Sequence, residues 1–281
     1  MDKIKILVAQ HKQVEVYKNN VYMPIHVGKA LHPELNLGIQ TDDTGDNISA
    51  LNPMYCELTA QYWAWKNLHN VEYIGLCHYR RYFEKEFTED NVESILDGND
   101  VILSSKYYFR SNILNWQFST LTPEDVTIFY LYLKRRFAAN KEKFETYFLK
   151  QNWIHPANMF VCKKDVFDKF CEWQFDILDD LKSLILPSPY SRERRILGYF
   201  AEALLPFFFH LNNYKIKEIP LVSMIGEKTH CYDFSFVPRM KENLLFTKGH
   251  QKFVETADII GGLKNDGILD KINTLLKAKG Y

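Results

Sequence analysis

The alternation of short apolar runs with longer helical segments is the feature that most limits what this 281-residue chain can fold into. Residues 4–9, 73–76, 100–104 and 159–162 are short apolar runs, and each predicts a buried strand. Strands that alternate with helices along a chain usually form a mostly parallel sheet covered on both faces. The expected fold class is therefore α/β.

The segments between these runs carry helical patterns. Helices are predicted over residues 53–68, 123–149 (as two helices), 164–184 and 194–211. In the first of them the large apolar side chains recur every three or four residues, which gives one continuous face. Residues 22–31 suggest a short helix or an irregular crossing, and residues 216–222 suggest a late strand. No internal repeat is present.

Composition and charge exclude several classes of protein. Lys and Arg total 35, as do Asp and Glu, and this zero net charge argues against a nucleic-acid partner. The five cysteines contain no Cys-x-x-Cys pair, which argues against a disulfide framework or a cysteine zinc site. The start lacks the features of a secretory signal, and no apolar run is long enough to span a bilayer. We therefore expect a cytoplasmic protein.

The sharpest motif is YIGLCHYRRYF, in which the predicted strand at 73–76 runs directly into His78, Tyr79, Arg80 and Arg81. In sheets of this kind ligands bind beyond the carboxyl ends of the strands, where His11 and the loop at 41–47 also lie. Guanidinium forks match phosphate oxygens, so the motif favours a diphosphate ligand. The alternative is a solvated basic turn. The glycine-rich dinucleotide motif and the phosphate loop are absent, which disfavours an NAD enzyme or a P-loop ATPase.

Polar residues precede the predicted helix at 53–68. Asp46 and Asn47 lie in a turn-rich loop, where they could cap the helix and favour an anionic group at its N-terminus. Capping combined with core packing explains the same pattern without a ligand.

Two further segments carry candidate residues. His155 and Asn158 immediately precede the strand at 159–162, a position that often lines a site, although His155 also fits an ordinary loop. Arg195 and Glu202 are seven residues apart, so they share one face of an otherwise apolar helix. Glu202 is costly to bury unpaired. It is either a surface residue, a partner of Arg195 or a carboxylate kept for function.

The acidic residues do not form the metal site that many sugar transferases use. Such enzymes hold a divalent cation with an Asp-x-Asp pair after a strand, whereas Asp42–Asp43 and Asp179–Asp180 are adjacent pairs that follow no apolar strand. Arginine side chains can neutralise a leaving diphosphate in place of a metal. We therefore expect no metal and no cofactor.

Taken together, these segments resemble bacterial glycosyltransferase domains known as domain of unknown function 4422 (DUF4422). The resemblance rests on GDNIS, NPMYCELTAQYWAWKN, YIGLCHYRRYF, DVIL, HPANMFVCKKDVF and RILGYFAE, in that order over about residues 3–222. It implies a GT-A-like fold with a nucleotide-sugar half at about 1–110 and an acceptor half at about 111–230. It also implies a role in capsule, exopolysaccharide or O-antigen assembly, with galactosyl or galactofuranosyl transfer from a UDP-sugar without a metal.

The motifs and the resemblance together suggest a role for each candidate residue. His78, Tyr79, Arg80 and Arg81, with His11, Asp46 and Asn47, are expected to bind the donor, and His155, Asn158 and Arg195 the sugar or acceptor. An inverting reaction needs a carboxylate base, with Glu202 the first candidate and Asp100 the second. The acceptor is expected to be a lipid-linked or soluble oligosaccharide. The rivals are a phospho-sugar or nucleotidyl transferase and a non-catalytic carbohydrate-binding or scaffold protein.

The last part of the chain, residues 231–281, is expected to be a helical appendage. Its apolar residues predict two short amphipathic helices joined at residues 265–267. Lysines cluster near the end of the second helix, so the pair could rest on anionic headgroups at the inner face of a membrane. The alternative is that both helices cap the catalytic core.

Overall fold

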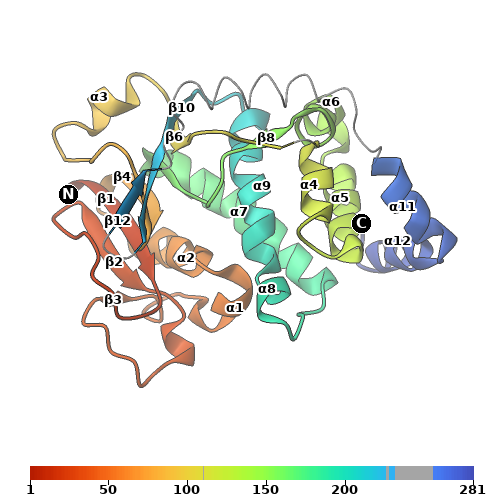
Figure 1. Ribbon diagram of the computed structural model, residues 1–281, viewed down its shortest axis with the longest axis horizontal. Helices are drawn as coiled ribbons and strands as arrows, with labels where there is room; N and C mark the ends of the chain where they lie inside the picture. Colours follow the sequence, from red (N-terminus) through yellow and green to blue (C-terminus); the bar gives the residue numbers. More distant parts are fainter. Residues whose placement is uncertain (110, 226–227, 232–255) are drawn as a thin grey trace.

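A mixed sheet lies at the left in Figure 1, and most of the helices pack to one side of it. The computed structural model describes residues 1–109, 111–225, 228–231 and 256–281. In these ranges ten strands belong to one sheet, and seven of them follow the order β10-β6-β9-β4-β1-β2-β3. Their bounds are β1 (Asp2–Gln10), β2 (Tyr22–His26), β3 (Gln40–Thr41), β4 (Val71–His78), β6 (Val101–Ser104), β9 (Phe160–Lys163) and β10 (Ile216–Ile219).

Most neighbouring strands in this order are parallel. β1 pairs with β4 on one side and β2 on the other, both in parallel, and β10 pairs in parallel with β6. The exception is β9, which runs antiparallel between β4 and β6. The predicted α/β class with a mostly parallel central sheet flanked by helices is confirmed.

Both faces of the sheet are buried. Along β1, Ile6 and Val8 point to one hydrophobic cluster, whereas Leu7 and Ala9 point to the other. Successive side chains of a strand face opposite sides, so a strand that is apolar at every position must be covered twice. This is why residues 4–9 read as a continuous apolar run.

Most helices cover one of these faces, and the short helix Val92–Leu96 contributes to the cluster on the other. The helices and helical turns are η1 (Lys29–Leu31), η2 (Ser49–Leu51), α1 (Asn52–Tyr55), α2 (Leu58–Asn67), α3 (Val92–Leu96), α4 (Ile113–Phe118), α5 (Pro123–Arg136), η3 (Ala138–Asn140), α6 (Lys141–Glu145), η4 (Thr146–Lys150), α7 (Lys164–Leu184), α8 (Ser191–Arg194), α9 (Ile196–Leu211), α11 (Thr256–Asn265) and α12 (Ile268–Ala278). α2, α7 and α9 contribute to the larger cluster, and aromatic stacking links α9 to α5, with 4.1 Å between the rings of Phe129 and Phe200.

Short strands complete the structure. β5 (Arg81–Phe83), β11 (Leu221–Ile225) and β12 (Lys228–Cys231) extend the main sheet, and β7 (Tyr107–Tyr108) pairs with β8 (Trp153–Ile154) in a separate small sheet. The late strand predicted at 216–222 is therefore two strands, β10 and β11. The division into a nucleotide-sugar half and an acceptor half stays a prediction, although the two halves share one sheet because β9 lies inside it.

Two of the predicted elements are wrong in part. The segment predicted as a helix or crossing at 22–31 contains the strand β2, whose side chains are buried or half-buried on both faces and so show no alternation. The helix predicted over 53–68 is split into α1 and α2 at Cys56, which has a φ of 54°. The Asn52 side chain donates a hydrogen bond of 2.8 Å to the Cys56 carbonyl and stabilises this break.

Two helices, α11 and α12, lie where tail helices were predicted, and α12 packs on the protein. Residues 232–255 of the predicted appendage lie outside the described part of the chain. Leu276 is fully buried and Ile272 nearly so, both in the larger hydrophobic cluster. Arg135 in α5 donates hydrogen bonds to the Asn273 side chain and to the carbonyl of Tyr281. The apolar face of α12 is thus occupied, which favours the core-capping alternative. No helix in the described part of the chain is long and apolar enough to cross a membrane.

We predict that Leu276→Ala lowers the free energy of unfolding by about 2–5 kcal/mol, because it leaves a cavity under α12. The exposed neighbour substitution Lys277→Ala serves as the control and should change stability by less than about 0.5 kcal/mol. Urea denaturation measures both. Equal stability of the two variants, together with sedimentation of the wild-type protein on anionic vesicles, would instead assign the apolar face of α12 to a membrane.

Candidate functional site

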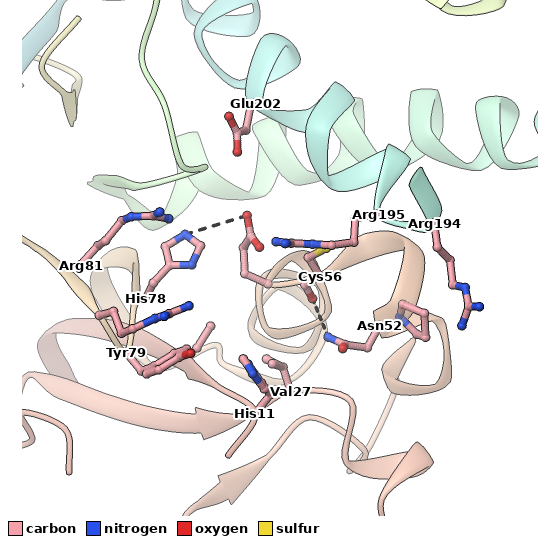
Figure 2. A pocket seen from close by; sticks show the side chains of 14 residues that line it. His11, Val27, Asn52, Cys56, His78, Tyr79, Arg81, Arg194, Arg195 and Glu202 are labelled. Carbon is pink, nitrogen blue, oxygen red and sulfur yellow. Dashed lines mark hydrogen bonds and ion pairs between the residues drawn. The ribbon is translucent and has the colours of Figure 1, made fainter. Parts of the chain in front are cut away.

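A cavity of about 520 Å³ opens beyond the carboxyl ends of β1 and β4 (Figure 2). Its floor comes from the sheet, where His11 follows β1 and His78 ends β4. Its opposite wall comes from α1, α8 and the start of α9. Ligands of α/β proteins bind at this edge of the sheet. The lining residues are Ala9, His11, Val27, Asn52, Pro53, Cys56, Glu57, His78, Tyr79, Arg80, Arg81, Arg194, Arg195 and Glu202.

Positive charge dominates the cavity. Among the described residues, Arg80, Arg81, Arg194 and Arg195 line it together with two carboxylates. Two of these arginines come from the strand end and two from the start of the helical wall. Figure 2 shows Arg81 and Arg195 pointing into the cavity from different sides. The Arg194 guanidinium is turned away and donates hydrogen bonds to the carbonyls of Ser188 and Pro189. Guanidinium groups that converge from two walls can hold several oxygens of one phosphate-bearing ligand.

Local pairing explains the shape of the HYRR motif. β4 ends at His78 and β5 begins at Arg81, so Tyr79 and Arg80 form the turn between two antiparallel strands. The turn is held from the far side, because the Met224 amide donates a hydrogen bond of 2.8 Å to the Arg80 carbonyl. The Tyr79 ring is largely buried, and the Arg80 guanidinium lies 4.8 Å from its centroid. The exposed arginines therefore stand on a fixed backbone.

A turn at residues 156–158 ties the two walls together. The Ala157 carbonyl accepts a hydrogen bond of 2.6 Å from His78 Nε2. The buried Asn158 amide donates to Glu57 Oε1 at 2.7 Å and to the Gly198 carbonyl at 3.1 Å. Glu57 Oε1 also lies 3.9 Å from His78 Nε2, an ion pair when the imidazole is protonated (Figure 2). These contacts join β4, α2 and α9 at the base of the cavity.

Glu202 carries a carboxylate with altered acidity. Burial, and after it the negative charge of Glu57, raise the pKa of Glu202 to about 7, although Arg81, Arg195 and a hydrogen bond from the Ala157 backbone act in the opposite direction. A carboxylate with a pKa near neutrality can take up a proton and release it during turnover.

His11 and Cys56 are affected by the same surroundings. Desolvation, and after it the positive charges of Lys12, Arg80 and Arg195, lower the pKa of His11, so its imidazole is neutral at pH 7. Burial raises the pKa of the Cys56 thiol to about 12, and this thiol accepts a hydrogen bond of 3.1 Å from Arg195 Nε. A thiol that stays protonated is a poor nucleophile, so Cys56 positions Arg195 instead.

The structure thus brings together His11, His78, Tyr79, Arg80, Arg81, Arg195 and Glu202 from the sequence-based candidates, all on one cavity. Asn158 does not line it but holds Glu57, which does.

The loop residues Asp46 and Asn47 lie outside the cavity lining. The Asp46 carboxylate accepts a hydrogen bond of 3.2 Å from the Tyr62 hydroxyl, and Asn47 donates to the carbonyls of Asp43 and Gly45. The Asn47 side chain therefore bonds within the loop, and the Asp46 side chain bonds to α2. Neither residue caps α1 or α2, because those helices begin after Leu51 and Glu57 without a side-chain cap.

Asp100 and His155 are also placed elsewhere. Asp100 precedes β6, which runs parallel to β4, so it lies at the opposite end of the sheet from His78. Its carboxylate accepts a hydrogen bond of 2.7 Å from the Lys215 amide. The buried His155 ring is bonded through Nδ1 to the Ser104 carbonyl at 2.5 Å, and burial lowers its pKa to about 4.

Beside the apolar Ala9, Val27 and Pro53, four lining residues with polar or ionisable side chains were not among the sequence-based candidates: Asn52, Cys56, Glu57 and Arg194. Glu57 had a detectable signal, because a carboxylate within the apolar face of a predicted helix needs a buried partner. The positive φ of Cys56, which ends α1, has no signal in the sequence. The described residues include no group of three or more His, Cys, Asp or Glu side chains arranged to hold a metal ion.

Comparison with known proteins agrees with this architecture. A solved structure described as the apo form of the bifunctional glycosyltransferase WbbM superposes with a TM-score of 0.68 and 27% sequence identity. The match covers 82% of this chain and 46% of WbbM, so this chain spans less than half of that protein's length. No curated protein matches the sequence. The family model for the domain of unknown function DUF4422 matches residues 5–213, most of the sequence. The chain therefore belongs to the DUF4422 family.

Proposed function

We propose that this protein is a glycosyltransferase that moves a hexosyl unit from a UDP-sugar to a saccharide acceptor. The observation that carries the proposal is the cavity that arginines from two walls line together with Glu202. Arginines suit the diphosphate of a nucleotide sugar, and a carboxylate with a pKa of about 7 suits the removal of a proton from an acceptor hydroxyl. The similarity to WbbM, a glycosyltransferase, supports the reaction class.

The donor's diphosphate is proposed to lie against Arg80, Arg81 and His78, with His11 beside the nucleotide. Negative charge builds up on the diphosphate as it leaves, and guanidinium groups already in position stabilise that charge. Arg195 approaches from the opposite wall and adds its positive charge to the same site. We propose that these side chains take the place of a divalent cation.

Glu202 is proposed as the general base of an inverting transfer. It borders the cavity, whereas the second candidate, Asp100, is held at the other end of β6 by the Lys215 amide. In the transfer, the acceptor oxygen forms a bond to the anomeric carbon and the bond from that carbon to the diphosphate breaks. The hydroxyl proton passes to Glu202, and UDP leaves with the bonding electrons.

The finer assignments rest on the family resemblance. We propose a galactosyl donor sugar, as pyranose or furanose, and an acceptor in capsule, exopolysaccharide or O-antigen synthesis, either lipid-linked or soluble. The reaction is proposed to take place in the cytoplasm.

UDP is expected to bind with the same affinity in the presence and absence of EDTA, because arginines rather than a metal meet its diphosphate. Isothermal titration calorimetry measures this. Loss of binding in EDTA would overturn the metal-free site and favour a phospho-sugar or nucleotidyl transferase. Absence of UDP binding under both conditions would favour a carbohydrate-binding or scaffold protein.

Arg80→Ala and Arg81→Ala are each expected to weaken donor binding or turnover by roughly 10–100-fold, since a hydrogen bond to a charged group contributes about 1.5–3 kcal/mol. Lys85→Ala is a suitable control, because this exposed lysine follows the same strand but does not line the cavity. Donor kinetics and circular dichroism separate lost binding from lost folding. Unchanged kinetics in both arginine variants would show that the motif is a solvated basic turn that binds no donor.

Glu202→Gln is expected to lower kcat by about 10²–10⁴-fold. The wild-type kcat/KM should rise with pH and level off above about 7, because the base must be deprotonated. Glu193→Gln, which alters a nearby acid outside the cavity, should keep both the rate and the profile. A wild-type profile without this rise, or an active Glu202→Gln variant, would exclude Glu202 as the base.

Glu202→Gln is expected to lower the rate but to raise the stability of the protein at high pH. The pKa of Glu202 is about 7 in the folded protein and 4.5 as its ordinary value, so the folded state binds more protons between these values. Stability contributed by the protonated form is present below pH 4.5 and is lost as pH rises through 7. Glu202→Gln should therefore be more stable than wild type at pH 8, with a smaller difference at pH 5, by urea denaturation.

A further inference from the structure

A second cavity of about 270 Å³ adjoins the first and shares two of its residues, Arg81 and Glu202. We propose that this second cavity binds the terminal sugar ring of the acceptor, an inference that rests on the glycosyltransferase function proposed above. It is smaller than the roughly 300–1,000 Å³ typical of sites for whole drug-sized ligands, which suits a guest of the size of a sugar ring.

Two aromatic side chains form part of the wall of this second cavity. Trp116 is half-buried and Tyr107 is 50% exposed, and both line the second cavity. Phe109 lies between them in the packing, stacked on Trp116 at 5.0 Å and tilted against Tyr107 at 5.9 Å. Pyranose and furanose rings present apolar C–H faces with a rim of hydroxyls, and such faces pack on aromatic rings. An aromatic ring combines a large apolar area with little conformational entropy to lose.

The fold holds these rings in place. Tyr107 belongs to β7, which pairs with β8, and Trp116 belongs to α4. The start of α4 is fixed by Asn112, whose side chain accepts a hydrogen bond of 2.8 Å from the Asn115 amide. The opposite wall includes Pro156 and Ala157, from the same turn that binds His78 in the first cavity. The same turn therefore lines the second cavity and contacts a residue of the first.

The distribution of charge separates the roles of the two cavities. All four lining arginines border the first cavity, whereas Arg81 is the only arginine among the described residues that line the second. A diphosphate is thus drawn to the first cavity. The second is mostly apolar and includes Ser105 in its lining, which suits an uncharged saccharide.

The shared residue Glu202 explains why the two cavities adjoin. An acceptor ring against Trp116 can place a rim hydroxyl beside Glu202 where the two cavities meet. The oxygen of that hydroxyl then faces the donor's anomeric carbon directly, with the carboxylate at its side. Glu202 can then take the hydroxyl proton as the new glycosidic bond forms and the bond to UDP breaks. Trp116 and Tyr107 are positioning residues in this scheme, because neither touches the reacting atoms.

The test uses the full chain saturated with UDP and a panel of methyl glycosides of glucose, galactose, mannose, rhamnose and N-acetylglucosamine. Binding is followed by ligand-observed NMR, and UDP affinity by calorimetry. At least one glycoside is expected to bind. Trp116→Ala and Tyr107→Ala should each lower the affinity for that glycoside by at least fivefold and leave the UDP affinity unchanged. Trp116→Phe should restore most of the binding, because it keeps an aromatic face.

Tyr17→Ala is the matched control. Tyr17 is 45% exposed, close to the value for Tyr107, and lines neither cavity, so its loss should leave glycoside binding unchanged. A protein that binds UDP but no glycoside of the panel, or a Trp116→Ala variant with unchanged glycoside affinity, would overturn the acceptor subsite and leave the proposed function standing. A protein that does not bind UDP at all would instead overturn the proposed function.

Discussion

The site depends on a strained turn at Ala157 and Asn158, where two successive residues adopt left-handed φ angles of 78° and 50°. Such a backbone costs about 1–3 kcal/mol per non-glycine residue and persists only where its surroundings hold it. Here the turn is held by hydrogen bonds to His78, Glu57 and the helix α9. Those same bonds join the sheet to the helical wall, so the conformation of one turn aligns the groups on both sides of the cavity.

Much of the architecture can be predicted from the sequence, because a strand that is buried on both faces is apolar at nearly every position. The strands β1, β4, β6 and β9 appear as short apolar runs, and the cationic rim appears as polar residues at the end of β4. Arg80 and Arg81 reach the cavity for a local reason, since a strand end fixes where the next residues lie. Glu202 could be singled out because a carboxylate in an apolar helix demands an explanation.

The parts that sequence reasoning placed incorrectly depend on partners distant along the chain. Asp46 and Asn47 carry the residue types of a helix cap, yet their hydrogen bonds are made within the loop and to α2. Asp100 precedes a strand rather than following it, and the direction of β6 decides that it lies away from the cavity. The local pattern indicates that Glu57 needs a buried partner, but it does not identify Asn158, which lies about a hundred residues further along the chain.

The position of β9 has a consequence for how this protein is made. β9 lies between β4 and β6 although it follows both in the chain, so the centre of the sheet cannot close until the ribosome has released the residues through Lys163. Until then the nascent chain carries two apolar strands whose inner edges are unpaired, a state prone to aggregation. Long-range pairing of this kind also slows folding. The strand order thus leaves these inner edges open to other chains until β9 has been made.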